Sequence, residues 1–271
     1  MKTHERHVDV IVDSDRIDGT LVAPGVEIPG VLFVHGWGAT QQQYLARARE
    51  VAALGFVCLT LDLSGHARTV ARRETVSRER NLRDVLGGYE ILAAHPQVDR
   101  ERIAVVGSSY GGYLVAILSE LRPVRWLGLR APALYRDAGW ELPKLQLHRE
   151  QDLVAYRRSF VPAAENRALR ACARFRGDVL IVESEHDELI PRPVIASYRA
   201  ACTEARSLTY RCIRGADHAL SSASSQQEYT RSIVQWFSEM LADARSAVRE
   251  PAQTIVADPG GVRAIGDSAS S

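Results

Sequence analysis

The chain has no excess of either charge. It contains 34 Lys and Arg against 33 Asp and Glu, a net charge of +1, so no overall field would attract nucleic acid or an anionic membrane. No apolar run is long enough to span a bilayer, and the polar segment 1–7 lacks the apolar core of a signal peptide. These absences argue against nucleic-acid-binding and membrane-spanning classes, and we expect a cytoplasmic protein.

Cysteine is scarce, and its spacing matches no common metal or redox motif. The four cysteines form no C-x-x-C pair and no zinc-type spacing, and two of them lie in apolar, strand-like runs; they are Cys58, Cys172, Cys202 and Cys212. We expect core thiols in a reducing compartment, with no metal and no cofactor.

The overall amino-acid composition is typical of a globular protein. Of 271 residues, 46% are hydrophobic, which is enough to build one sizeable core. Strand and helix patterns alternate without a linker and without an internal repeat, so we expect a single domain over residues 1–245. The segment 246–271 is rich in Gly, Ser, Ala and Asp and is predicted to be a disordered tail.

The order of strand and helix patterns indicates the fold class. Residues 8–12 and 17–22 predict an opening antiparallel hairpin, with Asp13-Ser14-Asp15 as its turn. Short apolar runs suited to buried strands then alternate with helical patterns; strands are predicted at 30–34, 56–61, 103–106, 124–129, 178–182 and 208–213, and helices at 44–54, 78–94, 113–118 and 225–244. This alternation predicts an α/β fold with a doubly wound, mostly parallel sheet.

One irregular segment follows the sixth strand. Pro132, Pro143 and Pro162 punctuate a polar, aromatic-bearing run over residues 133–165. Long loops in compact domains usually serve as lids or binding segments, so we interpret this run as a small cap over a site. An ordinary surface excursion is the alternative.

The motif Gly-x-Ser-x-Gly stands between a predicted strand and a predicted helix, at Gly107, Ser109 and Gly111. A residue at the apex of such a sharp turn is strained, and small neighbours let the strand and helix backbones approach each other. The Ser109 hydroxyl would then stand clear of the sheet beside the helix N-terminus. A glycine-rich turn without chemistry is the alternative interpretation.

A serine nucleophile needs a base within hydrogen-bond reach and an acid that orients the base. Ligands of open α/β sheets bind at the carboxyl ends of the strands, and Asp187 and His218 both follow later strands. We assign His218 as the base because it lies in a Gly-flanked loop after the last strand. Asp187 is the preferred acid because it sits a short loop past its strand.

Both assignments have competitors in the sequence. Other histidines near strand ends are His35, His66, His95 and His186, and other acidic residues near Asp187 or His218 are Glu183, Glu185, Glu188 and Asp217. For the oxyanion we expect two backbone N–H donors, those of Trp37 and Tyr110. The Trp37 side chain either lines the substrate pocket or has only a packing role against neighbouring side chains.

Substrate-binding candidates are fewer and weaker. We name Arg130, Trp140 and His148 as candidates. Arg130, together with Lys144, His148 and Arg149 in the expected cap, suggests an anionic substrate, and plain surface charge is the alternative.

These residues together resemble the α/β-hydrolase superfamily over about residues 8–244. The motifs that carry the resemblance are His35-Gly36-Trp37-Gly38, Asp62-Leu63-Ser64-Gly65-His66, His95-Pro96-Gln97-Val98-Asp99, the run from Arg102 to Gly112, Asp187, and Gly215-Ala216-Asp217-His218. The run into the serine is similar to the dienelactone-hydrolase and prolyl-oligopeptidase-like branches. Two features depart from those branches: dienelactone hydrolases use Cys where this chain has Ser109, and we expect no propeller domain ahead of the catalytic one.

The resemblance implies an α/β-hydrolase fold and ester or amide hydrolysis through an acyl-enzyme. We expect a carboxylesterase-like enzyme whose partner is a small-molecule ester, with neither nucleic acid nor membrane. A peptidase or amidase of the prolyl-oligopeptidase-like type is one alternative, and a catalytically inactive binding protein with this fold is another. The oligomeric state is open, a homodimer being one candidate.

Overall fold

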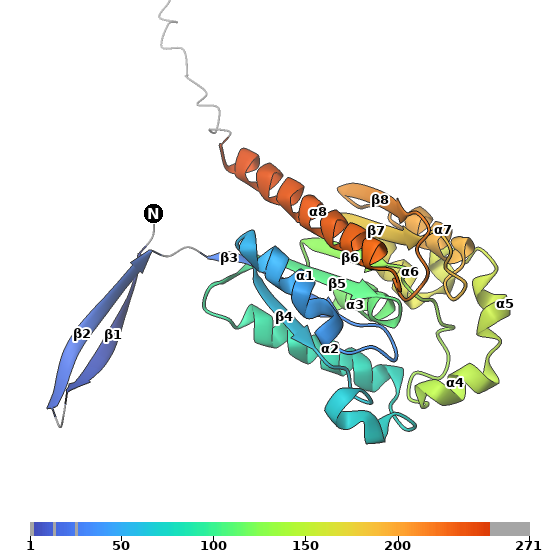
Figure 1. Cartoon of the computed structure of the whole chain (residues 1–271), viewed down its shortest axis with the longest axis horizontal. Helices are drawn as coiled ribbons and strands as arrows, with labels where there is room; N and C mark the ends of the chain where they lie inside the picture. The colour runs from blue at the N-terminus through green and yellow to red at the C-terminus, as the bar shows by residue number, and fades with distance from the viewer. Residues whose placement is uncertain (1–2, 13–14, 25–26, 250–271) are drawn as a thin grey trace, which may run out of the picture.

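A parallel sheet of six strands forms the centre of the computed structural model, which describes residues 3–12, 15–24 and 27–249 (Figure 1). The strand order is β4-β3-β5-β6-β7-β8. The strands are β3 (Ile28–Val34), β4 (Val57–Leu61), β5 (Val98–Ser108), β6 (Trp126–Arg130), β7 (Asp178–Ser184) and β8 (Ser207–Ile213). All adjacent pairs of this sheet are parallel, which confirms the predicted fold class.

The chain reverses its direction of travel across the sheet between β3 and β5. From β3 it moves outward to β4, then returns past β3 to β5, where Val34 pairs with Gly107. In open α/β sheets, the crevice outside the strand ends at such a reversal is the usual ligand site. The loops after β3 and β5 therefore meet where a site is expected.

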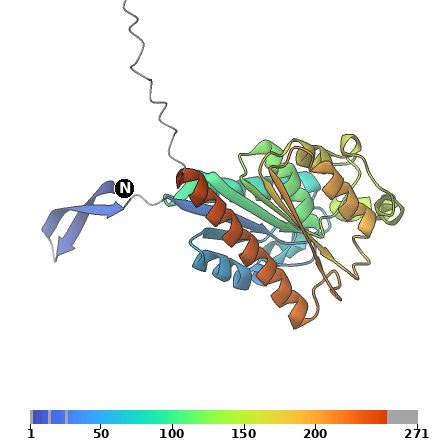
Figure 2. The ribbon, with the colours of Figure 1, turned by 90° about the horizontal axis from the view of Figure 1, so that it is seen from above.

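Helices cover both faces of the sheet (Figures 1 and 2). One face carries α1 (Gln42–Ala53) and α8 (Ala223–Arg249); the other carries α2 (Arg78–Ala93), α3 (Tyr110–Leu121), α6 (Arg167–Arg174) and α7 (Arg192–Ala201). Alternate side chains of β5 divide between two apolar clusters, with Ile103 and Val105 in one and Ala104 and Val106 in the other. This alternation follows from the two-residue period of a strand.

The expected cap, residues 133–165, contains three short helical pieces. They are α4 (Lys144–Glu150), α5 (Leu153–Arg157) and the 3₁₀ turn Ala163–Glu165. The segment is anchored to the start of α2, because the Lys144 N–H donates to the Val76 carbonyl (2.9 Å) and the Glu79 N–H to the Trp140 carbonyl (3.3 Å). A further 3₁₀ helix, Ala67–Arg72, precedes α2.

Strands β1 (Thr3–Val12) and β2 (Asp15–Pro24) pair antiparallel in a separate two-stranded sheet. Asp15, expected in the turn, is the first residue of β2, and Asp13 and Ser14 lie outside the described residues. Helix α8 extends to Arg249, beyond the domain boundary at 245 that we expected. The rest of the predicted tail, 250–271, lies outside the described residues.

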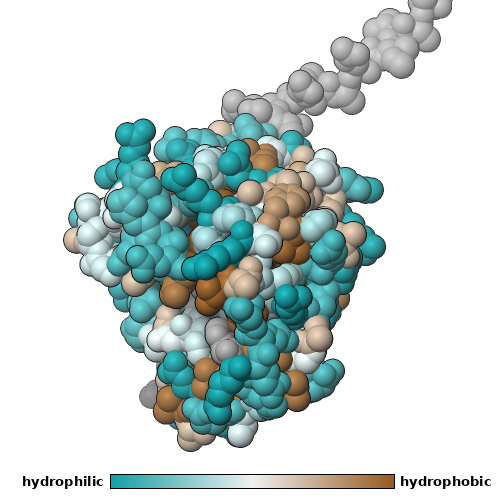
Figure 3. All heavy atoms as spheres, turned by 90° about the vertical axis from the view of Figure 1, so that its right-hand side faces the viewer, coloured by the Kyte–Doolittle hydropathy of each residue, from teal (hydrophilic) through white to brown (hydrophobic). Residues whose placement is uncertain are grey.

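The surface that carries α4 and α5 is mostly hydrophilic and shows only small apolar patches (Figure 3). Single exposed apolar residues are normal on folded proteins and need no partner to cover them. Among the described helices, none combines the length and the apolarity that crossing a membrane requires.

Candidate active site

Ser109 occupies the sharp turn between β5 and α3. Its backbone has φ 51° and ψ −116°, a region that non-glycine residues rarely adopt. The strained peptide is held from both sides: the Ser109 N–H donates to the Arg130 carbonyl (2.9 Å), and the Ser109 carbonyl accepts from the Ala133 N–H (3.0 Å). The surrounding structure therefore determines the unfavourable conformation.

The two motif glycines are required by close backbone contacts. A Cβ on Gly107 would lie 2.4 Å from the Gly111 carbonyl oxygen, and one on Gly111 would lie 2.3 Å from the Val34 carbonyl oxygen. Real Cβ atoms do not approach backbone so closely, so strand and helix can meet only if both positions lack a side chain. The steric reason inferred from the motif holds.

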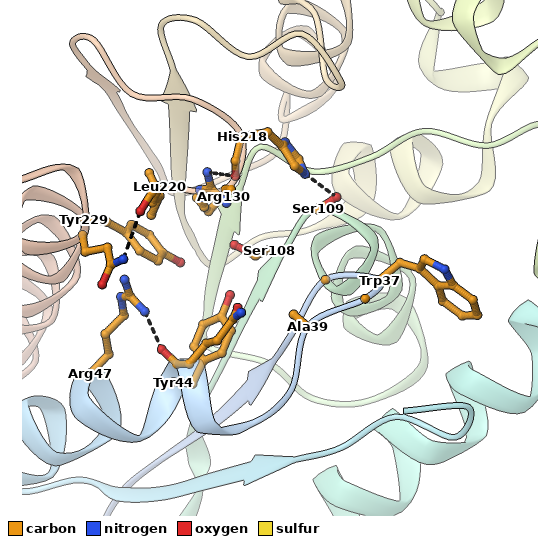
Figure 4. A pocket seen from close by; sticks show the side chains of 15 residues that line it. Trp37, Ala39, Tyr44, Arg47, Ser108, Ser109, Arg130, His218, Leu220 and Tyr229 are labelled. Atoms are coloured by element: carbon orange, nitrogen blue, oxygen red, sulfur yellow. Dashed lines mark hydrogen bonds between the residues drawn. The ribbon is translucent and has the colours of Figure 1, made fainter. Parts of the chain in front are cut away.

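The structure brings Ser109, His218 and Asp187 into one hydrogen-bonded line. The Ser109 Oγ lies 3.0 Å from His218 Nε2 (Figure 4), and His218 Nδ1 lies 2.7 Å from Asp187 Oδ2. Since a carboxylate only accepts, the Nδ1 atom carries the proton, and Nε2 is left to accept from the serine hydroxyl. The three residues come from the ends of β5, β7 and β8, as the strand-end argument predicts.

Asp187 is fixed by hydrogen bonds to both of its oxygens. Its Oδ1 accepts from the backbone N–H groups of Leu189 (3.0 Å) and Ile190 (2.8 Å), while Oδ2 accepts from His218. The Asp187 side chain is only 3% exposed. Three donors stabilise the charged carboxylate and hold it at one orientation.

The competing acidic residues are engaged elsewhere. Glu183 accepts from the Tyr210 hydroxyl, Glu185 from the Gly215 N–H (2.7 Å), and Asp217 from both the backbone and the hydroxyl of Ser221; Glu188 is exposed. Within the described chain, Asp187 is the carboxylate that reaches His218.

The other histidines also have different places. His95 and His186 are exposed, whereas His35 and His66 are buried beneath the loop that follows β3. His66 Nε2 accepts from the Gly38 N–H (3.0 Å), and His35 Nε2 accepts from the Leu63 N–H (3.0 Å). Both imidazoles thus act as acceptors that shape this loop.

The loop held by these histidines lies against the serine. A Cβ on Gly36 would stand 3.2 Å from the Ser109 Cβ, and the Trp37 indole packs edge-on against the Tyr110 ring at 5.7 Å. Tyr110 is the first residue of α3, so its N–H has no acceptor one turn earlier in the helix. This arrangement is compatible with oxyanion donors at Trp37 and Tyr110, which stay a prediction.

The buried His66 makes the stability of this loop sensitive to acid. Burial, and secondarily the nearby His35, lower the pKa of His66 to about 4, against 6.5 in an unfolded chain. Between pH 6.5 and 4 the unfolded chain binds a proton that the folded state refuses, so the free energy of unfolding falls as the pH falls. The loss from His66 reaches about 3 kcal/mol.

We expect His66→Gln to reduce this pH dependence, because an amide accepts a hydrogen bond but does not titrate. Urea unfolding at pH 7 and pH 4.5 measures the effect, with the exposed His95→Gln as the control. An equal loss of stability on acidification in the wild type and in His66→Gln would contradict the role of His66.

A cavity of about 350 Å³ opens beside Ser109 and His218 (Figure 4). It lies between α1 and the start of α8. Its lining residues are Gly36, Trp37, Gly38, Ala39, Gln43, Tyr44, Arg47, Ser108, Ser109, Arg130, His218, Ala219, Leu220, Gln226 and Tyr229. Among the described residues, none from the segment 133–165 lines this cavity.

The substrate-binding candidates from the sequence are not all at the cavity. Arg130 lines it, whereas Trp140 stacks on Tyr113 with ring centroids 6.1 Å apart and is not among its lining residues. Lys144 is buried, with its Nζ 4.1 Å from the Trp37 ring centroid, and Arg149 is exposed and pairs with Glu74. The His148 side chain lies outside the described residues.

Arg47 is a cavity residue that the sequence analysis missed. It lies on α1, one turn after Tyr44, and both side chains are buried rather than solvent-facing. The spacing of Tyr44 and Arg47 in the sequence could have revealed this position. Residues three apart on a helix share a face, and an aromatic residue such as Tyr44 indicates that this face is buried. An arginine at such a position is unusual enough to be noted.

Comparison with known proteins agrees with this architecture. Residues 41–244 match the model of the prolyl oligopeptidase family. No curated protein matches the sequence. Among solved structures, Est1E from Butyrivibrio proteoclasticus, determined with ferulic acid bound, has 14% identity and a TM-score of 0.61, and the match covers 88% of this chain and 96% of that one.

Two further structures show the range of proteins with this fold. Dienelactone hydrolase from Anabaena variabilis has 18% identity and a TM-score of 0.54, over 88% of this chain and 99% of that one. Acylaminoacyl peptidase from Pyrococcus horikoshii has 20% identity and a TM-score of 0.57, over 89% of this chain and 42% of that one. The family match spans most of the sequence, and the chain therefore belongs to the prolyl oligopeptidase family and has the α/β-hydrolase fold.

Proposed function

We propose that this hydrolase is a serine esterase that cleaves carboxylic esters with Ser109, His218 and Asp187 as its triad. The observation that carries the proposal is the hydrogen-bonded line from Asp187 Oδ2 through His218 to Ser109 Oγ. This arrangement supplies a nucleophile, a base and an orienting acid in the positions that acyl transfer needs.

The reaction follows from the proton positions in the site. His218 Nε2 takes the hydroxyl proton as Ser109 Oγ attacks the ester carbonyl, and the imidazolium that forms is stabilised by Asp187. The carbonyl oxygen becomes an oxyanion, for which the N–H groups of Trp37 and Tyr110 are the proposed donors. His218 then protonates the leaving alcohol, and water attacks the acyl-enzyme with the same base.

We favour ester cleavage over peptide cleavage as the reaction because of the size of the cavity. A volume of about 350 Å³ lies at the low end of small-ligand pockets and accommodates a short acyl group better than an extended peptide. Solved structures with this fold include Est1E with ferulic acid bound, a dienelactone hydrolase and an acylaminoacyl peptidase, so the fold alone does not choose between esters and amides.

A substrate panel tests the proposal. We expect turnover of p-nitrophenyl esters of two to six carbons, at least about 100-fold slower turnover of the matching p-nitroanilides, and covalent labelling by a fluorophosphonate probe. A preference for the anilides or for short peptides would instead support the peptidase alternative. Absence of both labelling and turnover would favour the inactive binding protein.

A further inference from the structure

The cavity beside Ser109 contains two buried positive charges. Arg47 comes from α1 and Arg130 from the end of β6, and they are 8% and 5% exposed. Arginines are almost never buried to this extent unless they are paired with a negative group. The identity of that group in this protein is therefore a question about its ligand.

The hydrogen bonds of these two arginines go to neutral groups. Arg47 Nη1 donates to the Gln43 carbonyl (2.6 Å), and Arg130 Nη2 donates to the Ser184 hydroxyl (3.0 Å) and to the carbonyls of Asp217 (3.3 Å) and His218. Among the described residues, the buried Nε–H of each guanidinium has no hydrogen-bond acceptor. Each arginine thus has one N–H group, on Nε, that could donate a hydrogen bond to a ligand.

No carboxylate of the described residues forms an ion pair with either arginine. Both guanidinium groups also lie near one aromatic ring: the Tyr229 ring centroid is 4.8 Å from Arg47 Cζ and 5.9 Å from Arg130 Cζ. Burial raises the pKa of both Tyr229 and Tyr44, so these hydroxyls stay neutral and do not balance the charge. The described cavity wall therefore has positive charges without a negative counterpart.

We propose that Arg47 and Arg130 bind a carboxylate carried by the substrate of Ser109. This inference rests on the proposed function and names its substrate class: esters with a free carboxylate near the scissile bond. The planar guanidinium groups match the two oxygens of a carboxylate, and the burial of both arginines strengthens the attraction. The same cavity is lined by Ser109 and His218, so a carboxylate bound there belongs to the molecule being cleaved.

Matched pairs of esters test this inference on the wild-type protein. On the acyl side, p-nitrophenyl hemiglutarate is compared with p-nitrophenyl pentanoate; on the alcohol side, the butyrate ester of 3-hydroxypropanoate is compared with propyl butyrate in a pH-stat. We expect kcat/KM to be at least about 30-fold higher for the charged member of one pair. The preferred pair shows which side of the ester carries the carboxylate. Equal rates within both pairs overturn the proposal.

The variant Arg47→Met removes one charge while it keeps most of the side-chain volume. We expect it to lower the ratio of kcat/KM for the charged ester over its neutral partner by about 30-fold or more. Arg49→Met, on the exposed side of the same helix, is the matched control and should leave the ratio unchanged. An unchanged ratio in a folded Arg47→Met overturns the proposal; if this variant does not fold, Arg47→Gln and the wild-type pairs decide.

A binding measurement separates this inference from the proposed function. In Ser109→Ala, which cannot form an acyl-enzyme, calorimetry should detect binding of glutarate at least about tenfold tighter than binding of glutaramide, its uncharged diamide. Glutarate binding without any esterase activity would keep the carboxylate site and reject the esterase. Esterase activity on neutral substrates without glutarate binding would do the reverse.

Discussion

Ser109→Ala is expected to lower kcat for ester hydrolysis by at least about 10,000-fold and to abolish fluorophosphonate labelling. The effect is large because Ser109 Oγ is the proposed nucleophile and lies 3.0 Å from the proposed base, His218 Nε2. Removal of Oγ leaves the strained backbone, the proposed oxyanion donors and the cavity. Residual rates would then reflect these groups alone.

The control for this variant is Ser119→Ala, near the other end of α3, where the hydroxyl only donates to the Ala116 carbonyl. It should retain wild-type kcat and full labelling. Labelling of Ser109→Ala at a wild-type rate would contradict the assignment and move the nucleophile to another residue. A circular dichroism spectrum shared by all three proteins establishes that the fold is unchanged.

Asp187→Asn is expected to reduce kcat by on the order of 10,000-fold with little change in the structure. The asparagine oxygen can still accept from the N–H groups of Leu189 and Ile190. Its amide nitrogen then faces His218 Nδ1 as a donor, which favours the tautomer with the proton on Nε2. In that tautomer the imidazole cannot accept the proton of Ser109, so fluorophosphonate labelling should slow as well.

Asp217→Asn provides a matched control, because Asp217 is adjacent to His218 in sequence but its carboxylate accepts from Ser221 at the surface. We expect a change in kcat of no more than a few-fold. Wild-type rates for Asp187→Asn would move the acid role to another residue, and a greater loss for Asp217→Asn would assign it to Asp217. The comparison therefore tests which of the clustered acidic residues orients the base.

The serine turn could be predicted from the sequence because its requirements are local. A strand and a helix joined through one strained residue need glycines at the close approaches, and Gly107 and Gly111 fill these places. The order of later strands could also be predicted, since parallel strands end on the same side of a sheet. This placed Asp187 and His218 near Ser109 before any contact was known.

The choice among acidic residues needed the tertiary structure. Glu183 lies near the end of β7 and Glu185 and Asp187 follow it, so sequence spacing alone gives only a preference. Hydrogen bonds from Leu189, Ile190 and His218 converge on Asp187, while the other carboxylates bind different donors. Donor directions of this kind depend on how loops pack, which no local pattern encodes.

The residues around the site were even harder to predict from the sequence than the choice among acidic residues. Lys144 was named with Arg130 as a sign of an anionic substrate, with plain surface charge as the alternative, yet it is buried against Trp37 and Tyr110. The cavity was expected under the segment 133–165, yet its walls come from α1, α8, the ends of β5 and β6 and the loops after β3 and β8. Burial of a long polar side chain depends on what packs over it, and that is decided by segments far away in sequence.

The sequence by itself determined the α/β alternation and the strained serine turn, because these follow from strand and helix periods and from short-range sterics. It also supplied candidates for the base and the acid of the proposed triad, because these residues follow later parallel strands. Only the tertiary structure placed Arg47 of α1 and Arg130 of β6 within 6 Å of the ring of Tyr229 of α8. These side chains come from three distant elements, and their shared cavity exists only when the helices pack on the sheet. The charge of that cavity, and with it the proposed substrate class, is a property of the packed chain.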